Sequence, residues 1–221
     1  MIKQLIDSYF AGFYHLGRVA TIDESQTRES RFDLRGENGA LVVAYGDGFA
    51  SFRNNAQSKI AVLDYEGYID KYTGTAFHTG RMKCDCILES EKEATVILDE
   101  ITSSNSGIEN LQKAIKGRKP YPGGKFEKAE NQLFESLRTL SDVPEIAAHF
   151  AKQLKRVCLC SYKLYVADEQ SLIGNPVSVF TRGQLEADKQ AKGNGVKISC
   201  PQIEALGFEF RRISHSYTYY I

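Results

Sequence analysis

The 221-residue chain has no tryptophan, only five prolines and five cysteines, and no excess of charge of either sign. Lysine and arginine together number 28, as do aspartate and glutamate. A net charge of zero argues against a dedicated non-specific nucleic-acid binder and against an acidic disordered protein. An odd number of cysteines, in a chain long enough to bury a core, argues against a secreted disulfide framework.

Long apolar segments are also missing. No run reaches the roughly 20 residues needed to cross a bilayer, and the N-terminus lacks an apolar segment with a small-residue cleavage site. We therefore expect a cytoplasmic protein with no membrane partner. No repeat or linker divides the sequence, so we expect a single α/β domain over residues 1–221.

Residues 2–16 carry apolar side chains at helical spacing, which predicts an amphipathic helix. The stripe consists of Ile2, Leu5, Ile6, Tyr9, Phe10, Phe13 and Leu16. Residues 31–52 alternate short apolar runs with glycine-rich turns, which predicts an antiparallel meander. We interpret Gly46-Asp47-Gly48 as a turn and not as a phosphate-binding loop, and residues 56–72 favour neither helix nor strand.

Residues 83–102 predict a β-hairpin with a charged turn at 89–93. The second strand is apolar on both faces until Asp99, as in an interior strand. Acidic residues at the end of such a strand are expected to be solvated, paired with a partner or part of a functional site. Asp85 begins the first strand and Glu100 ends the second, so the hairpin can bring these two carboxylates side by side.

The second half of the chain predicts a crossover between parallel strands. One helix has the apolar side Phe126, Ala129, Leu133, Phe134, Leu137 and Leu140, and a shorter one has Val143, Ile146, Ala147, Phe150 and Leu154. A strand at 156–166 completes a βαβ-like unit with the hairpin. The tail predicts a strand at 177–180, a polar helix at 184–192, a helical turn after Pro201 and a final strand over 208–221.

Paired carboxylates at one end of a sheet suit a hard cation such as Mg²⁺ or Mn²⁺. Asp85 and Glu100 are the candidate ligands, and the backbone carbonyl of Ile101 can add a third. The alternative without a functional role is that Asp85, Asp99 and Glu100 are surface carboxylates at strand ends.

The order Asp85, hairpin, Glu100-Ile101-Thr102 resembles the restriction-endonuclease-like superfamily, whose signature is written PD-(D/E)xK. The resemblance covers about residues 83–167, and it implies a mixed central sheet flanked by helices, here with extra N-terminal antiparallel strands. In that family the two acids bind the metal and the lysine activates or orients the attacking water. The resemblance thus implies metal-dependent hydrolysis of a phosphodiester in DNA or RNA.

Thr102 stands where this family has lysine, and Cys84 stands where it has proline. A hydroxyl cannot supply the positive charge, so an active enzyme needs a lysine from elsewhere. Lys125 and Lys128 are the candidates for that catalytic role, and Lys83 is a further one. The alternative is a catalytically inactive module that keeps the fold and binds nucleic acid or a protein partner. A third hypothesis is a homodimer that pairs the tyrosine-rich tail, 217–221, as an edge strand.

The basic segment 111–128 has six lysines and arginines against Glu127, whereas residues 85–100 have six acids against Lys92. The zero net charge is therefore a sum of opposed patches, which allows an acidic metal site beside a basic groove. Candidate nucleic-acid contacts are Lys116, Arg118, Lys119, Tyr121 and Gln132; a solvated loop is the alternative for most of them.

Two Cys-x-Cys pairs, Cys84/Cys86 and Cys158/Cys160, place both sulfurs of each pair on one face of a strand. Extended strands hold such sulfurs too far apart for easy joint ligation, so zinc is disfavoured and buried free thiols are expected. Among the four histidines, only His78 is expected near the acids, and a structural role for it is the alternative.

Overall fold

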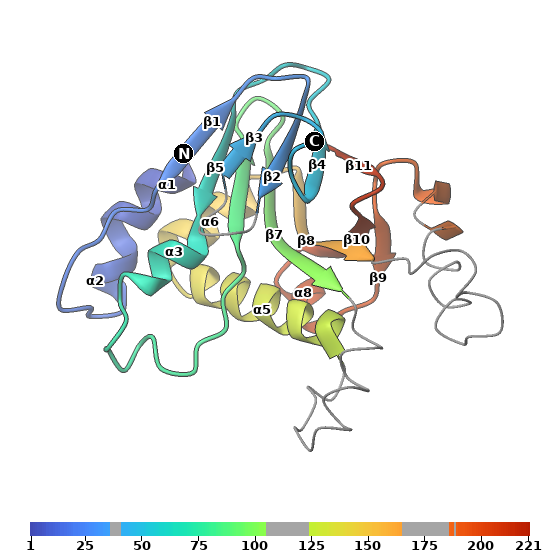
Figure 1. Cartoon of the computed structure of the whole chain (residues 1–221). Coiled ribbons are helices and arrows are strands. Elements are labelled where there is room, and N and C mark those ends of the chain that lie inside the picture. The colour runs from blue at the N-terminus through green and yellow to red at the C-terminus, as the bar shows by residue number, and fades with distance from the viewer. Residues whose placement is uncertain (36–40, 105–123, 165–185, 188) are drawn as a thin grey trace.

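Two β-sheets and a layer of helices make up the computed structural model of the chain (Figure 1). The structure describes residues 1–35, 41–104, 124–164, 186–187 and 189–221. The predicted mixed α/β class with a mixed central sheet is confirmed. The predicted strand at 177–180 and part of the predicted helix at 184–192 lie outside the described residues, while 186–187 and 189–191 are helical.

The central sheet has seven strands in the order β1-β5-β6-β7-β8-β10-β9. Their bounds are Glu24–Thr27 (β1), Ile60–Asp64 (β5), Cys86–Ser90 (β6), Thr95–Ser104 (β7), Lys155–Leu164 (β8), Val196–Ile198 (β9) and Glu209–Ser214 (β10). Strands β7, β8 and β10 run parallel, and the remaining pairs are antiparallel. The predicted hairpin is β6–β7, and the parallel β7–β8 pair confirms the βαβ-like unit.

The second sheet has four strands in the order β11-β4-β2-β3. Their bounds are Arg31–Arg35 (β2), Leu41–Val43 (β3), Ala50–Arg53 (β4) and Thr218–Tyr220 (β11). The predicted meander is wrong in its order, because β2 lies between β3 and β4 and pairs with both. Asp33 explains this: its Oδ2 accepts hydrogen bonds from the amides of Gly46 (2.8 Å) and Gly48 (3.1 Å), which returns the chain to the far side of β2.

The N-terminal helix is interrupted by a π-helical turn. It consists of α1 (Ile2–Leu5), a π-helix (Ile6–Phe10) and α2 (Ala11–Phe13). Ile2, Ile6 and Phe10 are buried as predicted, but Tyr9 and Phe13 of the predicted stripe are exposed. The wider π turn changes the angular spacing of side chains, so the stripe does not continue along one face.

Four further helices have the bounds Tyr65–Asp70 (α3), Gly124–Ser141 (α5), Pro144–Ala151 (α6) and Pro201–Ala205 (α8). The apolar side predicted for α5 is confirmed by the burial of Ala129, Leu133 and Leu137. Leu154, predicted to lie on the apolar side of the next helix, is instead exposed because α6 ends at Ala151. None of the helices in the described ranges combines the length and apolar character needed to cross a membrane.

The two faces of the central sheet carry separate cores. Helices α1, α3, α5, α6 and α8 contribute to the core on one face, which includes Leu98, Leu133 and Phe210. The four-stranded sheet covers the other face, where Phe32 and Phe52 stack with ring centroids 5.4 Å apart. Buried residues of β7 alternate between the cores, with Val96 and Leu98 in the first and Ile97 in the second.

The C-terminal segment contributes to both sheets. The single final strand predicted over residues 208–221 is wrong, because the chain turns after Ser214 and β10 and β11 belong to different sheets. The backbone amide of Tyr217 donates to the carbonyl of Ser214 at 2.9 Å and closes this turn. β11 is an edge strand of the four-stranded sheet, and it pairs in parallel with β4.

Candidate active site

The hairpin register brings the two predicted acids together. Cys86 pairs with Asp99 across β6 and β7, so the next position in this register sets Asp85 beside Glu100. Residues that pair directly in a ladder point to the same face. Ile87 and Leu98 belong to the helix-side core, so the alternation of β7 places Glu100 on that face, and the charge of Asp85 acts on it. The spacing of 15 residues is thus bridged by the hairpin, as the sequence predicts.

Asp85 is held by backbone groups on both sides. Its Oδ2 accepts a hydrogen bond from the Ile101 amide at 2.6 Å. Its backbone carbonyl accepts from the amides of Tyr65 and Glu66, each at 3.1 Å, in the first turn of α3. The side chain of Asp64 begins this helix by accepting from the Gly67 amide at 2.8 Å. Asp85 therefore lies where β6, β7 and α3 meet.

Both acids hold protons more tightly than free carboxylic acids do. The pKa of Asp85 is raised to about 7, chiefly by burial and also by the charges of the nearby Glu66 and Asp64, while the hydrogen bond from Ile101 opposes the shift. Burial also raises the pKa of Glu100, as do the charges of Asp85 and Glu66, whereas Lys128 lowers it. Glu100 is only 6% exposed, and its buried Oε2 has no hydrogen-bond partner in the described part of the chain.

Such a pair of carboxyl groups is unfavourable when both are ionised and no cation lies between them. An unsatisfied buried oxygen in a native structure calls for an explanation, and an absent ligand is one of the recognised ones. Pairs of perturbed carboxyl groups occur more often at functional sites than elsewhere. The arrangement is therefore suited chemically to receiving a cation.

A charged network extends outward from this pair along α3. The Lys83 ammonium lies 3.7 Å from Glu66 Oε1 and also pairs with Asp70. Nε2 of His78 lies 2.9 Å from Asp70 Oδ1. His78, the histidine expected near the acids, thus contacts Asp70 at the outer end of the network. Lys83, considered as a replacement for the missing lysine, is engaged by two other acids.

Lys128 is the predicted lysine whose charge acts on the pair. It lies on the exposed side of α5, and its charge lowers the pKa of Glu100. Thr102 is two positions beyond Glu100 on β7, so it faces the same side of the sheet. Lys125 lies in the first turn of α5. The positive charge absent at position 102 can thus come from the helix that covers this face.

One arginine that the sequence analysis did not identify continues the row of side chains. Glu100 pairs with Cys160 on β8, and Cys160 pairs with Arg212 on β10. At the usual strand spacing, Arg212 lies roughly 10 Å from Glu100 on the same face. Its guanidinium packs over the rings of Phe126 (4.7 Å) and Phe210 (5.3 Å), and its buried Nε has no hydrogen-bond partner among the residues that the structure describes.

Asp99 faces away from this site, although it follows the same strand. The alternation of β7 points its side chain to the other face of the sheet. There the Ser161 hydroxyl donates to it, at 2.9 Å from Oδ1 and 3.2 Å from Oδ2. Burial raises the pKa of Asp99 well above its usual range, and Ser161 opposes the shift. The surface-carboxylate alternative is wrong for Asp99 and Glu100, since both are buried.

The predicted nucleic-acid contacts can be placed only in part. Lys116, Arg118, Lys119 and Tyr121 lie outside the described residues. Gln132 lies on α5, and its side-chain amide donates to the Lys83 carbonyl at 2.8 Å. This contact fixes the segment that leads into Asp85, together with the Cys84 amide, which donates to Ser136 Oγ at 2.7 Å.

The cysteines are buried thiols, as the sequence predicts. Cys158 and Cys160 share the helix-side core, but Cys84 and Cys86 lie in different cores. The prediction that Cys84 and Cys86 share a face is wrong, because β6 begins only at Cys86. Within the described part of the chain, no three histidine, cysteine, aspartate or glutamate residues form a group that could hold a metal ion.

Glu66 and Arg212 are the candidate residues that the sequence analysis missed. Glu66 falls in the ambiguous range 56–72, where a capping aspartate followed by apolar residues at helical spacing was a usable signal. That spacing is carried by Tyr65, Tyr68, Ile69 and Tyr72, all of which are buried. Arg212 follows Phe208 and Phe210 at a spacing of two residues. In a strand this spacing places all three side chains on one face, so it indicated that Arg212 faces the core.

Comparison with known proteins gives no further identification. No protein-family model, no curated protein and no solved structure matches this chain. The functional assignment therefore depends on the geometry and chemistry of the residues themselves.

Proposed function

We propose that the chain is a divergent metal-dependent nuclease that hydrolyses phosphodiesters in DNA or RNA. The observation that carries this proposal is the pair Asp85 and Glu100, whose pKa values are raised by burial, with a Glu100 Oε2 that has no hydrogen-bond partner among the described residues. The strand order β5-β6-β7-β8, with α5 crossing from β7 to β8, also supports it. This order agrees with what the sequence resemblance implies for the core.

Two carboxylates are sufficient for the cation that the proposal requires. Mg²⁺ and Mn²⁺ prefer oxygen ligands, and Mg²⁺ commonly keeps several waters and binds through one or two carboxylates plus substrate phosphates. Asp85 and Glu100 would hold it. A strand residue turns its N–H and its C=O toward the same neighbour. Since the Ile101 amide is directed at Asp85, its carbonyl faces the same side and would add a third oxygen.

The cation would favour ionisation of water and neutralise charge that develops on the phosphate. The protein groups have separate tasks. Asp85 is oriented by the Ile101 amide, and the Gln132 and Ser136 contacts hold the segment before it. Lys128 and Arg212 supply positive charge on the same face of the sheet, where a substrate phosphate would lie. Lys128, with Lys125, is the candidate for the role left open by Thr102.

Incubation of the purified chain with labelled single- and double-stranded DNA and RNA, in Mg²⁺ or Mn²⁺, tests the proposal. We expect cleavage by the wild type and a loss of at least about 100-fold for Asp85→Asn and for Glu100→Gln. The matched control is Glu91→Gln, which removes an exposed carboxylate at the other end of the same hairpin. Absence of cleavage by the wild type, or undiminished cleavage by the two variants, would overturn the proposal.

The second candidate function is a catalytically inactive module that binds nucleic acid or a protein. Thr102 favours it, because the strand position that carries the catalytic lysine in the resembling family has only a hydroxyl here. Saturable nucleic-acid binding without cleavage, unchanged by Mg²⁺ and by Asp85→Asn, would support this function over the first.

A further inference from the structure

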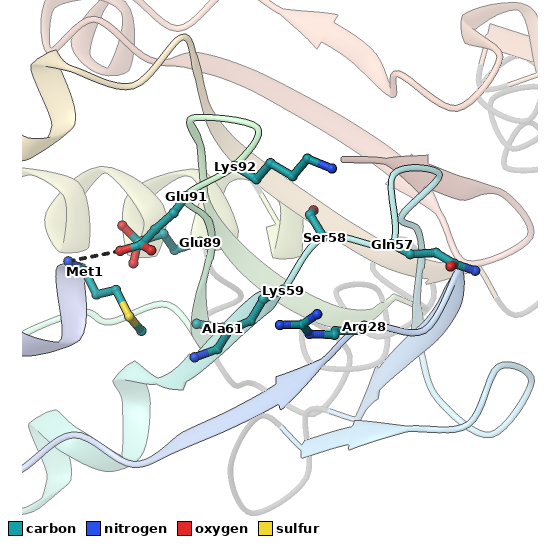
Figure 2. Close-up of a pocket in the computed structure, with 9 residues that line it drawn as sticks. All are labelled: Met1, Arg28, Gln57, Ser58, Lys59, Ala61, Glu89, Glu91 and Lys92. Carbon is teal, nitrogen blue, oxygen red and sulfur yellow. Dashed lines mark ion pairs between the residues drawn. The ribbon is translucent and has the colours of Figure 1, made fainter.

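A cavity of about 370 Å³ opens at the end of β6 opposite Asp85, beside the hairpin turn (Figure 2). Its lining includes three cationic residues and two acidic ones, Arg28, Lys59, Lys92, Glu89 and Glu91. The four steps from Asp85 to Glu89 correspond to about 13 Å of extended chain. The cavity is therefore a separate feature from the candidate active site.

Three cationic side chains from separate segments border this cavity. Arg28 follows β1, Lys59 precedes β5 and Lys92 lies in the β6–β7 turn. In Figure 2, Lys92 lies above Ser58, whereas Arg28 and Lys59 lie below it. Within the described part of the chain, none of the three makes a hydrogen bond or ion pair with a carboxylate. Their positive charges thus remain available to a ligand.

The two acidic residues of the lining are already engaged. Glu89 is 2% exposed; its Oε2 accepts from the Ile2 amide at 2.9 Å, and its Oε1 lies 2.6 Å from His149 Nε2. Glu91 lies 3.4 Å from the Met1 ammonium. In Figure 2 both acids lie at the Met1 end of the cavity. Each acid is thus already paired with a group other than the three cations.

The shape and composition of the lining restrict the class of ligand. The volume lies in the range of about 300–1,000 Å³ that is typical of small-molecule pockets. No aromatic ring is among the described residues of the lining, so the cavity offers no aromatic platform for a nucleobase. Like charges around a concave surface concentrate the potential and attract anions. Arginine and lysine together suit phosphate oxygens, arginine by its planar fork and lysine as a point charge.

We infer that this cavity is a phosphate-binding site, bordered by Arg28, Lys59 and Lys92. The phosphate can belong to a small phosphate ester or to the backbone of a nucleic acid. The inference is independent of the proposed nuclease function, since no residue of the cavity contributes to the Asp85 and Glu100 pair.

Calorimetric titration of the full chain with inorganic phosphate, in EDTA and low salt, tests the inference. We expect saturable binding at one site, weakened at least tenfold in Lys59→Gln/Lys92→Gln and several-fold in Arg28→Gln. The matched control is Lys189→Gln/Lys192→Gln, which removes two exposed lysines outside the cavity and should retain wild-type affinity. Lack of saturable binding by the wild type, or equal weakening in both double variants, would overturn the inference.

A second titration with a single-stranded oligothymidylate distinguishes the two sources of phosphate. If the site takes backbone phosphates, the cavity double variant also binds the oligonucleotide at least several-fold more weakly than the control. If it takes a small phosphate ester, only phosphate binding is lost. Phosphate binding by Asp85→Asn separates this site from the proposed active site. This variant should bind phosphate in EDTA as the wild type does.

Discussion

The backbone amide of Ile101 donates a 2.6 Å hydrogen bond to Oδ2 of Asp85, the residue that precedes β6. This contact joins the two ends of the hairpin where the ladder between β6 and β7 stops, and it sets Asp85 beside Glu100. The burial that accompanies it makes ionisation costly for both carboxyl groups.

Replacement of Asp85 by asparagine should stabilise the metal-free protein at high pH. The pKa of Asp85 is about 7 in the folded chain, above its ordinary value of 3.8. The folded state therefore binds more protons than the unfolded state between about pH 4 and about pH 7, and stability falls as pH rises through that window. In EDTA at pH 8 we expect the free energy of unfolding of Asp85→Asn to exceed that of the wild type by about 2 kcal/mol. This difference corresponds to an increase of roughly 4–8 °C in Tm. The difference should vanish near pH 4, and an equal Tm at pH 8 would contradict the raised pKa.

Removal of the Lys128 charge should weaken catalysis and shift its pH dependence. Lys128 lowers the pKa of Glu100, so Lys128→Gln should move the acidic limb of the cleavage profile to higher pH. We expect a loss of roughly 10- to 100-fold at pH 7 that is partly recovered at pH 9. Lys189→Gln serves as the control for loss of an exposed lysine. A lower rate with an unshifted profile would mean that Lys128 acts by some route other than Glu100.

Glu89 should stabilise the docking of the N-terminal helix. Burial acts to raise the pKa of Glu89. The hydrogen bonds to His149 and to the Ile2 amide have the larger combined effect and hold this pKa below its ordinary value. Its stabilising effect is therefore present above about pH 4.5 and lost as pH falls below it. Glu89→Gln should cost about 1–3 kcal/mol at pH 7, measured by urea unfolding, and much less near pH 3. An exposed control, Glu91→Gln, should change stability by less than about 0.5 kcal/mol.

All five cysteine side chains should be unreactive in the folded protein. They are buried and free, and burial raises the pKa of each thiol above its ordinary value. A thiol-directed chromogenic reagent at pH 8 should therefore label fewer than about one thiol per chain before unfolding and five after it. Rapid labelling of the native chain, or bound zinc in the purified protein, would contradict the assignment of these residues to the cores.

The sequence predicted the β6–β7 hairpin and α5 from local periodicity and a short turn, so the pairing of Asp85 with Glu100 was accessible. The parallel β7–β8 pair, although its residues are far apart in the chain, followed from the order strand, helix, strand. The strand order of the second sheet was not accessible. The β3-β2-β4 order depends on Asp33 reaching the Gly46 and Gly48 amides, and alternation alone does not specify which strand becomes the neighbour.

The candidate site was predictable in its two ligands but not in its surroundings. Glu66 reaches the site because α3 begins against the carbonyl of Asp85, a contact between segments about 20 residues apart. Arg212 arrives through the register of β8 and β10, which the sequence did not predict. The cavity beside Glu89 combines four segments, and its cations carry no local sequence signature.

The most direct test of the central claim is Mn²⁺ binding measured by the loss of the free-ion electron paramagnetic resonance signal. Carboxylates must be ionised to bind the cation, so the titration is done at pH 8, above the pKa of Asp85. We predict one saturable site in wild type and in Glu91→Gln, and its loss in Asp85→Asn and in Glu100→Gln. Affinity should fall as pH is lowered through about 7. Undiminished Mn²⁺ binding by both site variants, or none by wild type, would contradict the assignment of Asp85 and Glu100 as a metal site.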